Sequence, residues 1–166
     1  MNRHTSLYTA EQRRRRDASP WTTVQAILAP LQFAVFLVSL VLVVRFLVSG
    51  HGEAVATASV VVKTLTLYTI MVTGSIWERA VFGRYLFAQA FFWEDVFSML
   101  VLALHTAYLV TLVTDAVSVR DQMWIALAAY GAYVVNAAQF VLKLRAARRE
   151  QAEPSPPGEA GWEAGR

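Results

Sequence analysis

The chain has 166 residues and a mean hydropathy of +0.41. Its hydrophobic content of 56% is higher than the roughly 45–50% apolar content of an average soluble domain. Its lack of cysteine excludes disulfides, iron–sulfur clusters and thiolate metal sites. The formal net charge of +3 is unevenly spread, because residues 1–149 hold 14 of the 15 basic and 8 of the 12 acidic residues, and the remaining acidic residues crowd the C-terminal end.

The first nineteen residues predict a basic cytoplasmic tail. Four consecutive arginines, Arg13 to Arg16, precede a long apolar run that begins at Ser19 and Pro20. Serine followed by proline is typical of a helix start. Basic residues beside a first membrane span usually determine its orientation, so we expect these arginines to face the cytoplasm and not to bind nucleic acid.

Four apolar stretches each approach or exceed the roughly 20 residues that a helix needs to cross a bilayer. Their predicted bounds are residues 20–48, 54–77, 91–114 and 122–143. We therefore expect an all-α fold, an integral membrane four-helix bundle that occupies residues 20–148. An acidic tail rich in proline and glycine follows it over residues 149–166 and is expected to be disordered.

The distribution of Lys and Arg predicts that both termini are cytoplasmic. Eleven of these residues lie in the N-terminal tail, in the connector 78–90 and in the segment 143–149. The two opposite loops carry only Arg120, together with Arg45 at the end of the first span. Because cytoplasmic loops are enriched in Lys and Arg, the connector 78–90 is expected on the same side as the termini.

That connector is unusually apolar for a cytoplasmic loop, and two interpretations of it stay open. It is either an aromatic belt at the membrane interface or a rim over a flat hydrophobic ligand. In the second case Arg79 and Arg84 would lie near an anionic group of the ligand. In the first case they would set topology and contact lipid headgroups. The apolar residues are Val81, Phe82, Tyr85, Leu86, Phe87, Phe91 and Phe92.

Two tryptophan–acid pairs flank the connector. Trp77 and Glu78 precede it, and Trp93, Glu94 and Asp95 follow it. Carboxylates at the edge of the hydrocarbon layer are costly and are often functional. Clustered carboxyl groups in a partly dry site retain a proton, which a general acid requires, so we expect the three acids to form an acid/base pool. The alternative is that they are helix-end charges paired with the connector arginines.

Further polar side chains gather in the cytoplasmic half of the predicted spans. In lipid such groups are expected to point into the bundle, where they either line a cavity open to the cytoplasm or form interhelical hydrogen bonds of about 0.6 kcal/mol each. For Gln25, Gln32 and Asn136 both roles stay open. The residues concerned are Gln25, Gln32, Thr73, Ser98, Asn136 and Gln139.

Two ionisable residues are expected deeper in the membrane. Lys63 either lines the cavity or extends outward to the interface. His105 is either a hydrogen-bonded core histidine, an axial ligand to the metal of a bound macrocycle, or a proton carrier. A proton or ion pathway through both residues is a further alternative.

Several common sites are excluded. A bis-histidine haem needs two histidines inside the membrane, and only His105 is placed there. A di-iron carboxylate bundle needs Glu-x-x-His motifs, and the sequence has none. The chain also lacks a glycine-rich phosphate loop and a serine nucleophile elbow.

Six sequence runs carry a resemblance that covers residues 7–149. They are YTAEQRRRRD (8–17), LAPLQF (28–33), YTIMVTGSIWE (68–78), VFGRYLF (81–87), FFWEDVFS (91–98) and NAAQF (136–140). Together they resemble the 3-vinyl (bacterio)chlorophyllide hydratase family of bacteriochlorophyll biosynthesis. The stretches 68–78 and 91–105, the latter continuing from the FFWEDVFS run through His105, are specific.

The resemblance implies a hydro-lyase that adds water across the C3-vinyl group of chlorophyllide or bacteriochlorophyllide, giving a 3-(1-hydroxyethyl) product. General-acid protonation of the vinyl group would precede attack by water. No cofactor is expected, because the magnesium belongs to the substrate macrocycle. The enzyme would lie in the bacterial inner membrane with its active site facing the cytoplasm, and other pigment-biosynthesis enzymes are candidate partners.

With this substrate in view, the predicted site has three parts. The acid/base residues are Glu78, Glu94 and Asp95. The substrate contacts are Arg79, Arg84, Trp77, Trp93, Phe92, Tyr85, Asn136, Gln139, Gln32 and Lys63, and His105 is the predicted ligand of the pigment magnesium. The alternative function is a non-catalytic membrane pigment carrier or assembly factor with the same cavity.

Overall fold

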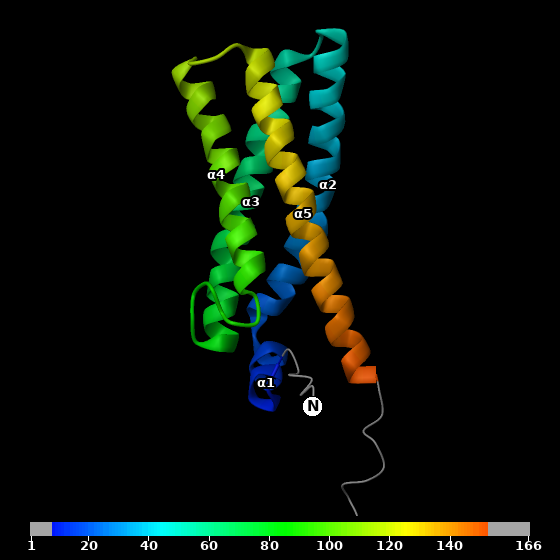
Figure 1. Ribbon diagram of the computed structural model, residues 1–166, viewed down its shortest axis with the longest axis vertical. Helices are drawn as coiled ribbons and strands as arrows, with labels where there is room; N and C mark the ends of the chain where they lie inside the picture. The colour runs from blue at the N-terminus through cyan, green and yellow to red at the C-terminus, as the bar shows by residue number, and fades with distance from the viewer. Residues whose placement is uncertain (1–7, 153–166) are drawn as a thin grey trace, which may run out of the picture.

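A computed structural model describes residues 8–152, and four of its five helices are long and apolar enough to cross a membrane (Figure 1). A short helix, α1 (Ala10–Ala18), precedes them. The long helices are α2 (Pro20–Ser49), α3 (Glu53–Phe82), α4 (Phe92–Thr114) and α5 (Val119–Ala152). Over the described residues the regular secondary structure is entirely helical. The predicted all-α fold with four candidate membrane spans is therefore confirmed.

The long helices form two antiparallel hairpins, α2 with α3 and α4 with α5, which lie side by side (Figure 1). The α2–α3 and α4–α5 loops lie at one end of the bundle. Helix α1, the α3–α4 connector and the C-terminal part of α5 lie at the other end (Figure 1). We call the latter the connector end, and the site described below is built there.

Aromatic and small side chains fill the centre of the bundle. The ring of Phe36 on α2 lies 5.4 Å from that of Tyr130 and 4.9 Å from that of Tyr133, both on α5. The outward faces of the helices are apolar as well; Val41 and Val113, for example, are largely exposed. An apolar outer surface is expected of helices surrounded by lipid.

Hydrogen bonds between side chains also join the helices. Gln25 donates to Thr73 Oγ1 at 2.8 Å, and the hydroxyl of Ser39 pairs with those of Ser59 at 2.8 Å and Tyr130 at 2.5 Å. For Gln25 this contact supports the interhelical role over the cavity role.

Helix α3 was predicted to end at residue 77, but it continues to Phe82. The charge of Glu78 suggested a helix end, yet its side chain is accommodated inside the bundle. The helix ends at Gly83 instead, whose φ of +79° is in the left-handed region that glycine adopts without strain, and whose amide donates to Arg79 O at 3.0 Å. The connector therefore spans residues 83–91, not 78–90.

The other helix ends also differ from prediction. Helix α5 covers residues 119–152, not 122–143, because its charged C-terminal turns remain helical beyond the apolar span, which ends at Ala146. The predicted disordered tail starts within this helix, and residues 153–166 lie outside the described part of the chain.

Helix α1 occupies part of the predicted N-terminal tail, of which residues 1–7 are not described. It begins with a capping box, in which Gln12 N donates to Thr9 Oγ1 at 3.2 Å and Thr9 N donates to Gln12 Oε1 at 2.9 Å. The Thr-x-x-Gln pattern was visible in the sequence and could have revealed this helix.

Candidate active site

Glu78 and Asp95 form a buried carboxyl pair at the connector end. Glu78 comes from the penultimate turn of α3 and Asp95 from the first turn of α4, and their side chains are 5% and 4% exposed. The two carboxyl groups lie close enough to interact directly. Two buried carboxylates side by side repel each other and lose hydration, so sharing one proton between them is favourable.

The connector folds over this pair and gives each carboxyl group a backbone donor. Phe87 N donates to Asp95 Oδ2 at 2.7 Å, and the next amide, Ala88 N, donates to Glu78 Oε2 at 3.3 Å. Phe87 adopts a φ of +59°, which is uncommon for a residue with a side chain. Consecutive amides around a left-handed residue can form a small anion-binding concavity. The connector is therefore arranged to stabilise negative charge on the pair.

Glu94, the third predicted acid, turns toward α5 instead. Its Oε2 lies 2.7 Å from Lys143 Nζ, and this ammonium group also lies 5.1 Å from the ring centroid of Phe91. Glu94 is thus engaged in an ion pair that joins α4 to α5. Sequence reasoning had treated Lys143 only as a topology signal, since nothing local links two residues that are 49 positions apart.

One helical turn inward, a polar contact crosses between α4 and α5. Asn136 Nδ2 donates to Ser98 Oγ at 2.9 Å, and both residues are buried. The side-chain oxygens of Asn136 and Gln139 are also buried, and neither has a hydrogen-bond partner among residues 8–152.

Exposed aromatic side chains lie on the connector and on the first turn of α4, and we call this surface the aromatic rim. The rings of Phe87 and Phe92 lie 5.8 Å apart and those of Phe92 and Trp93 lie 5.6 Å apart. The guanidinium of Arg79 lies 4.6 Å from the ring centroid of Tyr85. The rim consists of Tyr85, Phe87, Phe92 and Trp93, which are 55%, 36%, 44% and 67% exposed. Arg84 is exposed in the same connector.

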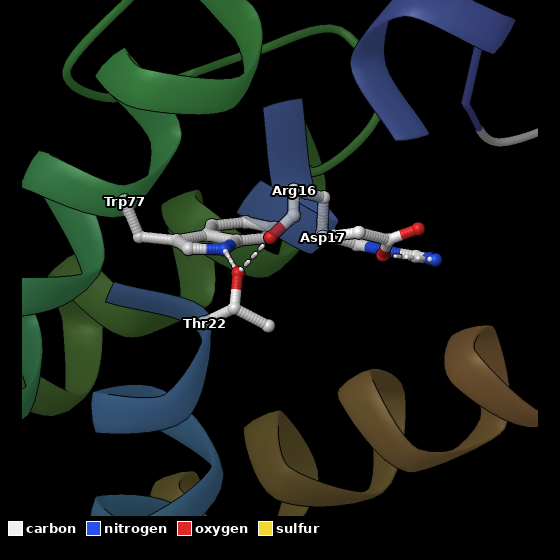
Figure 2. Close-up of polar contacts among 4 residues, drawn as sticks. All are labelled: Arg16, Asp17, Thr22 and Trp77. Carbon is white, nitrogen blue, oxygen red and sulfur yellow. Dashed lines mark hydrogen bonds and ion pairs between the residues drawn. The ribbon is translucent and has the colours of Figure 1, made fainter. Parts of the chain in front are cut away.

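Trp77 does not join the rim. Its Nε1 donates to Thr22 Oγ1 at 3.0 Å, and that hydroxyl donates to the carbonyl oxygen of Arg16 at 2.6 Å (Figure 2). The Trp77 ring packs edge-on against Phe82 and Phe91. This tryptophan therefore connects α3 to α1 and α2.

Three other predicted residues lie near the middle of the bundle, away from the carboxyl pair. Lys63 Nζ lies 3.9 Å from the ring centroid of Tyr133. The Gln32 side-chain amide, oriented so that its nitrogen donates to Thr66 O, accepts a hydrogen bond from Lys63 Nζ at 3.2 Å. Lys63 is fully buried and does not reach the interface. It precedes Glu78 by fifteen residues, which is about 22 Å along α3.

His105 is enclosed at a similar depth. Its Nδ1 lies 2.8 Å from Val101 O, its ring lies 5.9 Å from that of Tyr130, and Nε2 has no partner among the residues described. The side chain is 0% exposed. A free Nε2 suits an axial ligand, but ten residues, or about 15 Å of helix, separate His105 from Asp95.

Comparisons with known proteins agree on one family. The family model described as 2-vinyl bacteriochlorophyllide hydratase matches residues 8–146. A protein of that name from Rhodobacter capsulatus is 67% identical over 147 residues, which cover 89% of this chain and 85% of the relative. Another, from Cereibacter sphaeroides, is 65% identical over 145 residues, which cover 87% of this chain and 90% of the relative. No solved structure matches the chain.

Proposed function

This chain belongs to the 2-vinyl bacteriochlorophyllide hydratase family, and we propose that its buried carboxyl pair, Glu78 and Asp95, carries out the acid–base chemistry. The protein is an enzyme, a hydro-lyase that adds water to a vinyl group in bacteriochlorophyll synthesis. The expected family and activity are thus confirmed, and the alternative of a non-catalytic carrier is not supported. The vinyl-bearing carbon is numbered 2 in the relatives' name and 3 above, and we refer to it as the ring vinyl group.

The observation that carries this proposal is the close approach of two buried carboxyl groups, each of which accepts a hydrogen bond from a connector amide. Such a pair shares one proton, so it contains an acid and its conjugate base side by side. Hydration of an alkene uses both, because one carbon must gain a proton and the attacking water must lose one.

The reaction proceeds in two balanced steps. The protonated carboxyl group donates its proton to the terminal vinyl carbon, which becomes a methyl group, and positive charge develops on the inner carbon and spreads into the macrocycle. Water then forms a carbon–oxygen bond to the inner carbon and gives a proton to the carboxylate. The pair regains its single proton, and the product carries a 1-hydroxyethyl group. The overall change is redox-neutral, so the proposal requires no redox cofactor.

Glu94 has a different position from the pair. Its carboxylate is held by Lys143, which supports a role in fixing the first turn of α4 and therefore Asp95. We propose this positioning role for Glu94. Its predicted membership in the acid/base pool remains untested.

The aromatic rim is the proposed binding surface for the macrocycle. A flat apolar ring can stack on exposed aromatic side chains, and the connector amides place this surface directly beside the carboxyl pair. Arg79, which stacks on Tyr85, is available to the substrate propionate. Arg84 is a second candidate for this contact.

The remaining predicted contacts have less support. Trp77 is engaged with α1 and α2, and Gln32 and Lys63 bond to each other near the middle of the bundle. Ligation of the pigment magnesium by His105 would require the helices around this enclosed residue to part. These assignments remain predictions.

We further propose that the connector end faces the cytoplasm. The support is the excess of Lys and Arg at this end, which holds the N-terminal segment, the connector and the end of α5 (Figure 1). With this orientation the substrate reaches the rim from the cytoplasmic side of the membrane.

Substitution of the acids tests the assignment of the carboxyl pair. Glu78→Gln and Asp95→Asn are each expected to lower kcat by roughly 100- to 10,000-fold, because either change removes a member of the shared-proton pair. Turnover is measured as oxygen-18 incorporation from labelled water into the hydroxyethyl product, and pigment binding as the absorption of the bound pigment.

Glu94→Gln is expected to lower thermal stability more than turnover. Asp121→Asn, an exposed acid at the other end of the bundle, is the matched control, and wild-type turnover in both pair variants would contradict the assignment.

A substrate ester tests the role of Arg79. Arg79→Met is expected to raise KM for the free propionate substrate by roughly tenfold or more, with little change in kcat, because a charge-assisted contact is lost. The methyl ester of the propionate is expected to bind both forms alike. Arg84→Met distinguishes the two connector arginines, and Arg145→Met is the control on α5. Equal KM changes for acid and ester would contradict a contact with the carboxylate.

Single cysteines test the orientation, since the natural chain has none. In intact spheroplasts a membrane-impermeant maleimide is expected to label Ala116→Cys, in the α4–α5 loop. It is expected to label Gln89→Cys, in the connector, only after the membrane is permeabilised. The reverse pattern would contradict a cytoplasmic connector end.

A further inference from the structure

A small cluster of polar side chains lies one helical turn inward from the carboxyl pair, between α4 and α5. It consists of Ser98, Asn136 and Gln139. Asn136 uses its amide nitrogen to bond Ser98 Oγ at 2.9 Å, whereas its own side-chain oxygen and that of Gln139 have no partner among residues 8–152. Asn136 is 9% exposed and Ser98 is 4% exposed. Two buried acceptors left without donors are unfavourable, so this arrangement calls for a small donor molecule.

Water is the donor that suits these groups. A buried water typically makes about three hydrogen bonds to polar groups that would otherwise be unpaired. The two amide oxygens can accept its hydrogens. The hydroxyl of Ser98, which accepts the Asn136 amide hydrogen, still has its own hydrogen to donate.

Helices α4 and α5 place Ser98, Asn136 and Gln139 close to the carboxyl pair. On α4, Ser98 follows Asp95 by three positions and Glu94 by four, and such residues are neighbours on one helix face. On α5, Asn136, Gln139 and Lys143 are spaced by three and four residues and share a face. The contacts of Lys143 with Glu94 and of Asn136 with Ser98 show that these two faces pack together.

We propose that Ser98, Asn136 and Gln139 bind the water that adds to the ring vinyl group. This inference rests on the proposed function and gives a more specific role to Asn136 and Gln139, which the sequence had suggested only as substrate contacts. The bound water forms the new carbon–oxygen bond to the inner vinyl carbon, and one of its O–H bonds breaks. The first step leaves Glu78 and Asp95 both ionised, and the proton that the water releases returns to one of these two carboxylates.

Competition between water and methanol tests the water site directly. The cation can be captured by either molecule, giving the hydroxyethyl product or its methyl ether. In wild type, a water held by these three side chains is expected to outcompete most methanol. Asn136→Ala makes room for one more carbon and is expected to raise the ratio of ether to alcohol by roughly tenfold. Asn136→Leu fills the space without a polar group and is expected to lower kcat by roughly tenfold to a hundredfold, with KM for the pigment nearly unchanged.

A matched control is available at the other end of α5. Gln122 is also a buried amide whose oxygen has no partner among the described residues. Gln122→Ala is expected to leave the ratio at its wild-type value, and Ser98→Ala provides a second, smaller change within the site. Binding of the pigment with unaltered absorption verifies that each variant is folded.

A raised ether-to-alcohol ratio in Asn136→Ala, with no change in Gln122→Ala, supports the water site. An unchanged ratio in both Asn136→Ala and Ser98→Ala would overturn it, even if their rates fall. Because the ratio reports only the capture step, it decides the water site whichever residue donates the first proton. Failure of this inference is therefore distinguishable from failure of the acid–base assignment, which the turnover of the Glu78 and Asp95 variants decides.

Discussion

The burial of two neighbouring carboxyl groups is the constraint on which the connector end of this bundle depends. Away from water, such groups are tolerated only when they share a proton and find donors for their remaining oxygens. Helix α3 runs past Trp77 to bring Glu78 inside, and α4 begins early enough to place Asp95 beside it. The connector then turns through a left-handed Phe87 so that two successive amides reach the pair. The same turn leaves the rim aromatics exposed next to the acid, where a flat substrate can lie.

The N-terminal segment, which consists of Tyr8, Thr9 and helix α1, packs against this arrangement and stabilises it. Tyr8 is buried against Phe82, at the end of α3, and Phe91, just before α4, with ring centroids 5.8 and 6.4 Å away. Phe82 precedes the connector and Phe91 is its last residue, so Tyr8 packs against both ends of it. The guanidinium of Arg16 lies over the Tyr8 ring at 4.9 Å, and burial raises the pKa of the Tyr8 hydroxyl. The N-terminal segment therefore belongs structurally to the active-site end, although composition alone suggested only a topology signal.

The sequence predicted the parts of this protein that depend on composition and local pattern. The four spans follow from apolar runs, and the chemistry follows from carboxyl groups next to an aromatic connector. Contacts between distant segments could not be read in this way. Glu94 was grouped with Glu78 and Asp95 because they are close in sequence, yet Lys143, 49 residues away, holds it in an ion pair. Trp77 was predicted as a substrate contact together with Trp93, yet its indole N–H bonds to Thr22 on α2. The helix end at Gly83 was missed because a charged residue was taken for a stop, although glycine is the more reliable signal.

The shared proton between Glu78 and Asp95 is the central claim, and infrared spectroscopy of the resting enzyme tests it most directly. A protonated carboxyl group has a carbonyl stretching band that is distinct from those of a carboxylate and shifts in deuterium oxide. We expect wild type to show this band without substrate, and we expect it to be altered or lost in Glu78→Gln and in Asp95→Asn but retained in Glu94→Gln. Absence of the band from wild type, or its persistence unchanged in both pair variants, would contradict the account.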